Sequence, residues 1–113
     1  MKKKYSIESL TEIADGDKDF MRIVAKTFLE EIPPDLKTME EAIENDNRGL
    51  AYQFAHKMKS NLEMFGLNLG KEITAIESWT KNLKNKSTIE AHLNNILATL
   101  ETVFMELKED FKL

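Results

Sequence analysis

The sequence lacks cysteine and is poor in glycine and proline. With 0 cysteines, disulfide bonds, thiolate zinc sites and a catalytic thiol are all excluded. Only 4 glycines and 2 prolines occur in 113 residues, which is too few for a fold of many strands joined by tight turns. No apolar run approaches the roughly 20 residues of a membrane-spanning helix. We therefore expect a helical protein with no part in a membrane.

An excess of positive charge is also missing. The 16 basic and 20 acidic residues leave a formal net charge of -4, whereas a nucleic-acid-binding protein needs a basic stripe. The chain begins with Met1 and three lysines, but polar and acidic residues follow them in place of the apolar core of a signal peptide. We therefore expect a cytoplasmic protein with no nucleic-acid partner.

What the sequence does contain is helical periodicity. Hydrophobic residues make up 42 % and charged residues 32 %, a composition typical of soluble, highly helical proteins. The length fits a single domain, residues 1–113, with one continuous core. Apolar residues recur at steps of three and four in five stretches. These stretches are 7–14, 18–44, 47–65, 69–83 and 88–111.

Helix boundaries are marked by capping residues and by two prolines. Ser6 can cap the first helix, Asp46 or Asn47 the third, and Ser87 or Thr88 the last. Pro33 and Pro34 predict a break or kink, because proline restricts the backbone and removes a helical hydrogen bond. We expect 18–44 to form one long helix that is kinked there.

Short connections between these helices predict antiparallel packing. The expected fold is all-α: an up-down four-helix bundle with a short additional N-terminal helix and a proline-kinked second helix. In the fourth helix the apolar seam runs from Leu69 to Leu83. Trp79 lies off that seam, and we expect it to cover the edge of the bundle.

The third helix carries the most informative residue. Its apolar side chains share one face, and His56 falls roughly 165° from the centre of that face. His56 should therefore point to water from a helix whose other side is buried. Lys59 and Ser60 stand one turn further along and flank it. Gly66 ends the helix, since glycine readily adopts the left-handed conformation at a helix C-terminus.

This stretch resembles the histidine phosphotransfer (HPt) domain. The family pattern is Ala-His-x-x-Lys with a glycine ten residues after the histidine, and here it reads Ala55-His56-Lys57-Met58-Lys59 with Gly66. The resemblance implies that His56 accepts a phosphoryl group and that Lys59 compensates its charge. Many members have glycine directly after the lysine. This chain has Ser60, whose hydroxyl can donate a hydrogen bond to the phosphoryl group.

The resemblance also implies partners. An exposed imidazole with one lysine is half of a phosphoryl-transfer site, since such transfer needs charge compensation and positioning. The missing half, an acidic pocket with Mg²⁺ and an acceptor aspartate, would come from a receiver domain of a response regulator or a hybrid histidine kinase. We expect no cofactor or metal on this chain itself, and we expect a monomer.

The sequence also predicts what the module does not do. Its glycines lie far apart and form no phosphate-binding loop, so it should neither hydrolyse ATP nor phosphorylate itself. We expect a phosphoryl carrier and not an enzyme. It would accept phosphoryl from an aspartyl-phosphate on one receiver domain and pass it to another.

A docking surface should surround the histidine. Glu63 is the nearest acid that we can place on the outer face of the third helix, roughly 10 Å away by helical rise. Ser78, on the fourth helix, lies on a face that could approach His56. The residues expected to contact a partner are Tyr52, Gln53, Lys57, Glu63, Leu10 and Ile13.

Two alternative functions stay open at this point. The chain could be a helical-bundle adaptor that binds a signalling partner and never carries phosphate. It could also be an enzyme that uses His56 as a general base. The absence of a nearby carboxylate to orient the ring counts against the second alternative.

Overall fold

A computed structural model describes residues 3–113 of the chain. Within this range the regular structure is helical and contains no strand. Five α-helices and one short 3-10 helix, η1, follow one another along the chain. They are α1 (Ile7–Ile13), α2 (Lys18–Glu44), α3 (Arg48–Met64), α4 (Gly70–Trp79), η1 (Lys86–Ile89) and α5 (Glu90–Phe111). The predicted all-α class is confirmed.

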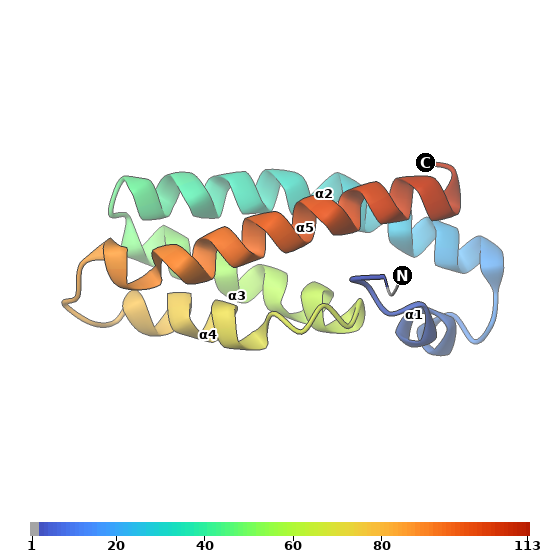
Figure 1. Ribbon diagram of the computed structural model, residues 1–113, viewed down its shortest axis with the longest axis horizontal. Coiled ribbons are helices and arrows are strands. Elements are labelled where there is room, and N and C mark those ends of the chain that lie inside the picture. The colour runs from blue at the N-terminus through green and yellow to red at the C-terminus, as the bar shows by residue number, and fades with distance from the viewer. Residues whose placement is uncertain (1–2) are drawn as a thin grey trace.

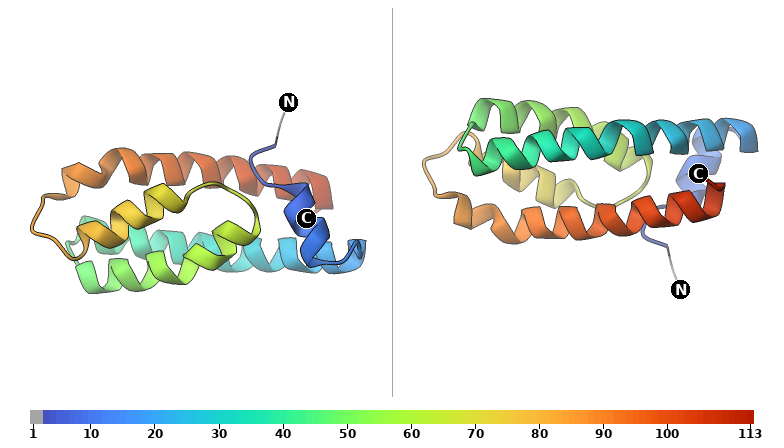
Figure 2. Two further views of the ribbon diagram at one scale, coloured as in Figure 1. Left: turned by 90° about the horizontal axis from the view of Figure 1, so that it is seen from below. Right: turned by 90° about the horizontal axis from the view of Figure 1, so that it is seen from above.

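The four longer helices form an up-down bundle (Figure 1). Neighbours along the chain run antiparallel, and α2 packs against both α3 and α5, so α3 and α5 lie diagonally across the bundle. The short α1 lies across one end, beside the start of α2 and the end of α5 (Figure 2). The loop from α4 to η1 lies at the opposite end. Within residues 3–113, no helix is long and apolar enough to span a membrane.

Capping side chains explain where most of the helices begin. Ser6 accepts from the backbone N–H of Ser9, and Asn47 accepts from that of Leu50, as predicted. The prediction for the last helix was wrong. Asn85 caps η1 by accepting from the N–H of Ser87, and α5 follows η1 without a capping side chain.

The second helix continues through both of its prolines. Helix α2 spans 27 residues, with Pro33 and Pro34 inside it. The prolines therefore do not break it into two helices, and the bend that we expect there stays a prediction. Asp35, directly after them, is a buried charged residue. Its carboxylate accepts from the ammonium of Lys57 at 3.1 Å, which links α2 to α3 beside His56.

Two predictions about the fourth helix were wrong. Helix α4 ends at Trp79, so Leu83 lies beyond it in the loop and is fully exposed. Trp79 is buried and does not lie at the bundle's edge. Its indole N–H donates to the carbonyl of Lys84 at 3.1 Å, which satisfies its polar atom inside the core.

Candidate functional site

His56 lies on the outer face of α3, as its sequence position predicts. Its side chain is 64 % exposed, whereas Ala55 and Met58 beside it are fully buried. The buried and exposed residues of α3 follow the helical period, so the exposure of His56 results from local geometry. An imidazole in this position is open to a second protein.

A carboxylate from α4 contacts the imidazole. His56 Nδ1 lies 3.1 Å from Glu77 Oε2, and the other oxygen of Glu77 lies 3.6 Å from Lys59 Nζ. The Glu77 side chain is only 13 % exposed, so it is held between the two helices. One carboxylate therefore connects the candidate acceptor to the candidate cation.

We predicted Glu63 as the nearest acid on the outer face of α3, where it is exposed, but the acid that contacts the ring is Glu77 of the neighbouring helix α4. The expectation for Ser78 missed the contact by one residue: Ser78 is exposed, and its neighbour Glu77 faces the site. A signal was present in the sequence. His56 lies ten residues before Gly66 and Glu77 eleven after it, so an antiparallel hairpin about this turn brings them opposite each other.

The contact with Glu77 determines which ring nitrogen can react. A carboxylate oxygen accepts hydrogen bonds, so the contact favours the tautomer in which Nδ1 carries the ring proton and donates a hydrogen bond to Glu77. In the neutral imidazole the lone pair then lies on Nε2, the nitrogen that Glu77 does not contact. Nε2 is therefore the ring nitrogen whose lone pair this contact leaves available.

Tyr52, one turn before His56, restricts the orientation of the same ring. The two ring planes differ by 11° and their centroids lie 5.6 Å apart, which is a stacked arrangement. The ammonium of Lys81 lies 4.5 Å from the centroid of the Tyr52 ring. Tyr52 was predicted to contact a partner, and in the structure it supports the imidazole.

The other docking residues predicted on α3 are exposed. Gln53 and Glu63 are exposed on the outer face of α3, and Lys57 is exposed beside them, where it pairs with Asp35. Ser60, the predicted hydrogen-bond donor to the phosphoryl group, is exposed on the same helix. These positions are compatible with partner contact.

The two predictions on the first helix have different outcomes. Leu10 is only 1 % exposed, so the prediction that it contacts a partner was wrong; it belongs to the core. Ile13 is exposed. The backbone N–H of Ser6 donates to the carbonyl of Phe65, which places α1 at the end of α3. That end lies roughly 13 Å of helical rise from His56.

Within the part of the chain that the structure describes, no group of three or more histidine, aspartate or glutamate side chains is arranged to hold a metal ion. The pair of His56 and Glu77 offers only two such groups. The contacts at His56 thus join an imidazole, a carboxylate and an ammonium group.

Comparison with known families identifies the module. The family model of the Hpt domain matches residues 24–109, which is most of the chain. The chain belongs to the Hpt domain family. Hpt domains are helical bundles that act as phosphoryl carriers in phosphorelays, and the observed fold agrees with this membership. Searches among curated proteins and among solved structures found no match.

Proposed function

We propose that this Hpt domain carries a phosphoryl group on His56. It would accept that group from the aspartyl-phosphate of one receiver domain and pass it to a second receiver domain. The observation that carries the proposal is an imidazole that is 64 % exposed while its Nδ1 is held 3.1 Å from a largely enclosed carboxylate. This arrangement presents Nε2 to a partner and fixes the proton on the other nitrogen.

The transfer step follows from these atoms. The Nε2 lone pair attacks the phosphorus of the aspartyl-phosphate, a nitrogen–phosphorus bond forms, and the bond from phosphorus to the aspartate oxygen breaks. The aspartate leaves as a carboxylate. The phosphorylated ring keeps its proton on Nδ1 and carries positive charge, which the carboxylate of Glu77 stabilises. Passing the group on reverses these steps.

Lys59 and Ser60 would act on the phosphoryl oxygens. In the unphosphorylated protein Lys59 pairs with Glu77, 3.6 Å away, so its ammonium is held by the same carboxylate that contacts the imidazole. A phosphoryl group on Nε2 would compete with Glu77 for this cation. Ser60 is exposed one turn after His56 and can donate its hydroxyl hydrogen. The Mg²⁺ ion that phosphoryl transfer uses would be held by the receiver domain.

The module would work as a cytoplasmic carrier that depends on kinases for its phosphoryl groups. Its receiver partners would belong to response regulators or hybrid kinases. Because the kinase that supplies their phosphoryl groups uses ATP, the module would act in the cytoplasm. It would act as a monomer on one receiver domain at a time. It would not hydrolyse ATP or phosphorylate itself, because its role is to carry a group that a kinase has already transferred.

The substitution His56→Gln tests the proposal. The variant should fold normally, because the replaced side chain is exposed, and it should lose all phosphoryl acceptance. The measurement is incubation with phosphorylated receiver domains from the same genome, with circular dichroism as the folding control. Phosphate on the wild-type chain should be labile in acid and stable in base, as phosphohistidine is.

Two outcomes would overturn the proposal. If no receiver domain transfers phosphoryl to the wild-type chain, the module is better described as an adaptor that only binds its partner. If the His56→Gln variant still takes up phosphate, another residue is the acceptor.

A further inference from the structure

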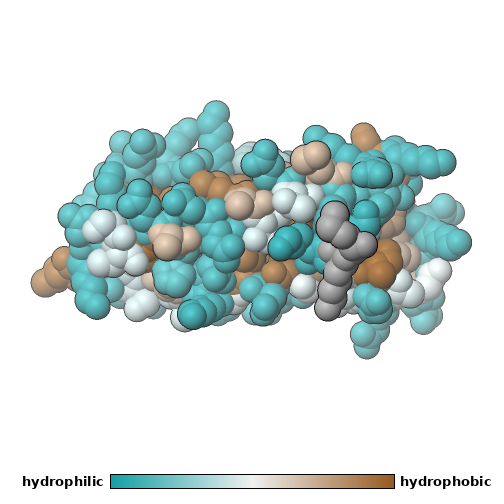
Figure 3. Space-filling view, viewed as in Figure 1, coloured by the Kyte–Doolittle hydropathy of each residue, from teal (hydrophilic) through white to brown (hydrophobic). Residues whose placement is uncertain are grey.

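The segment 80–85, which connects α4 to η1, presents an unusual surface. We call it the Leu83 loop. Leu83, near its middle, is fully exposed, and Figure 3 shows apolar atoms projecting from the end of the molecule where this loop lies. Single exposed apolar side chains are common on protein surfaces, so the exposure of Leu83 alone does not indicate a binding surface. Two further features distinguish the Leu83 loop from an ordinary surface loop: its backbone is held by hydrogen bonds, and its charge is positive.

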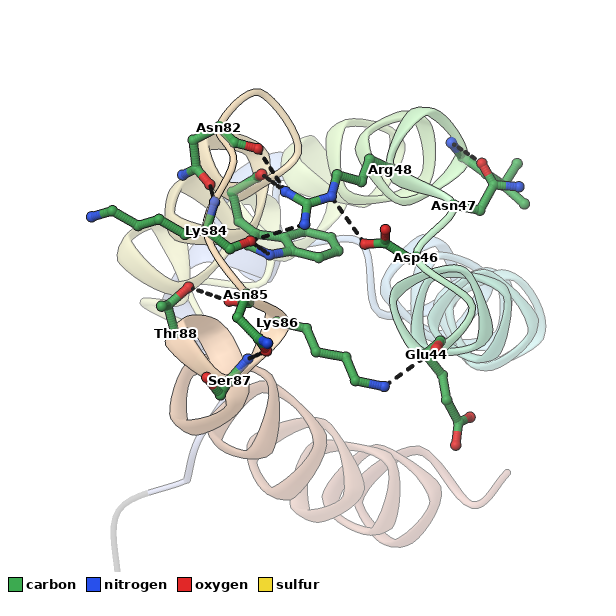
Figure 4. Close-up of polar contacts among 12 residues, drawn as sticks. Glu44, Asp46, Asn47, Arg48, Asn82, Lys84, Asn85, Lys86, Ser87 and Thr88 are labelled. Carbon is green, nitrogen blue, oxygen red and sulfur yellow. Dashed lines mark hydrogen bonds and ion pairs between the residues drawn. The ribbon is translucent and has the colours of Figure 1, made fainter.

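The backbone of the Leu83 loop is held by Arg48, the first residue of α3. The Arg48 guanidinium donates to the carbonyl oxygens of Trp79, Asn82 and Lys84 at 3.0, 2.7 and 2.9 Å. It also lies 4.2 Å from the centroid of the buried Trp79 ring. Figure 4 shows Arg48 reaching these carbonyls from the start of α3. A loop fixed on both sides of Leu83 loses little conformational entropy when a partner binds it.

The loop is also basic, in a chain whose net charge is -4. No acidic residue occurs from Ser78 to Ile89, whereas Lys81, Lys84 and Lys86 are exposed in that stretch. In Figure 4 the side chain of Lys84 points away from the bundle. An apolar side chain among ammonium groups fits an acidic surface that contains an apolar socket.

The Leu83 loop is continuous with the site at His56. Lys81 contacts the Tyr52 ring, and that ring stacks on the imidazole. Arg48, which holds the loop, precedes His56 by two turns of α3, or roughly 12 Å of helical rise. One side of a standard protein interface covers about 800 Å², a patch roughly 28 Å across. A patch of that size centred on His56 extends roughly 14 Å along α3, so it reaches Arg48, which holds the Leu83 loop.

We infer that the Leu83 loop is a contact surface for the receiver domain that exchanges phosphoryl with His56. This inference rests on the proposed function, because the receiver's acidic acceptor pocket must approach His56. Leu83 inserts into an apolar socket beside that pocket, and Lys84 faces its acidic rim. Both side chains act in recognition and take no part in the chemistry at Nε2.

The test separates recognition from chemistry. Variants Leu83→Ser and Lys84→Glu change only exposed side chains, since the hydrogen bonds from Arg48 and Trp79 to the loop use its backbone carbonyls. The matched control is Met105→Ser with Lys108→Glu, an exposed pair on α5, diagonally across the bundle from α3. Phosphoryl uptake is measured from a phosphorylated receiver domain and, separately, from the small donor phosphoramidate, which needs no docking.

With the receiver domain, each loop variant should raise KM about tenfold, or about 1.4 kcal/mol, with kcat unchanged. Lys84→Glu should also weaken the dependence of KM on salt. With phosphoramidate, both variants should match the wild type, and the α5 control should match it with both donors. This pattern supports the inference.

Other results overturn it. An unchanged KM with the receiver domain would show that the loop lies outside the interface. If the wild-type chain takes phosphoryl from phosphoramidate but from no receiver domain, a receiver domain is not the partner of the loop. If the variants instead lose binding to vesicles of phosphatidylserine and phosphatidylcholine while KM is unchanged, the loop binds anionic lipid. Failure of the proposed function is distinct, because the wild-type chain itself would then take phosphoryl from no receiver domain, whereas failure of the inference alone leaves wild-type uptake intact and the KM of the loop variants unchanged.

Discussion

At the scale of single residues, the site consists of the exposed imidazole of His56 and the neighbours that orient it. Glu77 holds Nδ1 of His56, and Tyr52 stacks against the ring. The ammonium of Lys59 lies 3.6 Å from Glu77, and a phosphoryl group on His56 can form an ion pair with it. From the sequence, we disfavoured a general-base enzyme because no acid was expected to orient the His56 ring. That premise was wrong, because the Glu77 carboxylate contacts the ring. Membership of the Hpt family is what favours phosphoryl transfer.

The substitution Glu77→Gln tests this orienting role. Glutamine keeps an oxygen that can accept from Nδ1 but removes the charge that stabilises the phosphorylated ring. Hydrogen bonds to charged groups contribute about 1.5–3 kcal/mol, so we expect phosphoryl acceptance to slow roughly tenfold or more. Nitrogen-15 NMR of the His56 ring should show the proton on Nδ1 in the wild type and a shifted tautomer balance in Glu77→Ala.

The control for that experiment is Glu101→Gln, which removes an exposed acid from α5 and should leave the transfer rate unchanged. A Glu77→Gln variant that transfers at the wild-type rate would show that the carboxylate has only a structural part.

At the scale of elements, the end of α3 connects two parts of the molecule. Gly66 has a φ of +64°, its N–H donates to the carbonyl of Glu63, and the N–H of Leu67 donates to that of Leu62. This is the Schellman arrangement, in which a left-handed residue satisfies the last carbonyls of a helix. A Cβ added at Gly66 would lie 2.7 Å from the Cβ of Ser6, the residue that caps α1. The end of α3 and the start of α1 therefore depend on the same glycine.

The substitution Gly66→Ala should destabilise the protein by about 2 kcal/mol or more, because backbone strain at positive φ alone costs roughly 1–2 kcal/mol. The contact with Ser6 adds to this cost. Gly16→Ala is the matched control, since Gly16 also has a positive φ, of +77°, but no atom within 4 Å of the added Cβ. Urea unfolding of both variants isolates the contribution of the Ser6 contact, and equal losses in the two variants would contradict it.

At the scale of the whole molecule, the two ends of the chain are joined. The hydroxyl of Tyr5 donates to Asp110 Oδ2 at 2.5 Å, and the backbone N–H of Lys4 donates to Glu106. Tyr5 is buried. Burial, together with the hydrogen bond to Asp110, raises the pKa of the Tyr5 phenol above its usual value near 10. The segment before α1 is thus fastened to the last turns of α5.

This raised pKa predicts a loss of stability at alkaline pH. A group whose pKa is raised by folding contributes its full stability below the unfolded pKa, near 10, and loses it as the pH rises through the folded value. The Tyr5→Phe variant should be less stable by about 2 kcal/mol at pH 7. It should lose less stability than the wild type when the pH rises above about 10. Thermal unfolding between pH 7 and pH 11 measures both effects.

Tyr52→Phe is the control for this prediction, because it removes the only other tyrosine and should keep the wild-type pH dependence. Parallel pH profiles for Tyr5→Phe and the wild type would contradict the role of the Tyr5 phenol.

Much of this protein followed from the sequence alone. The helices, their approximate ends, the left-handed Gly66 and the outward direction of His56 could be predicted because each depends on the period of one helix or on one turn. The tertiary structure alone decided the burial of Leu10 and Trp79. The spacing about Gly66 puts Glu77 opposite His56, but only the tertiary structure shows that its carboxylate contacts the ring. Those features depend on the rotation and register of one helix against another, which side chains distant in the sequence determine together.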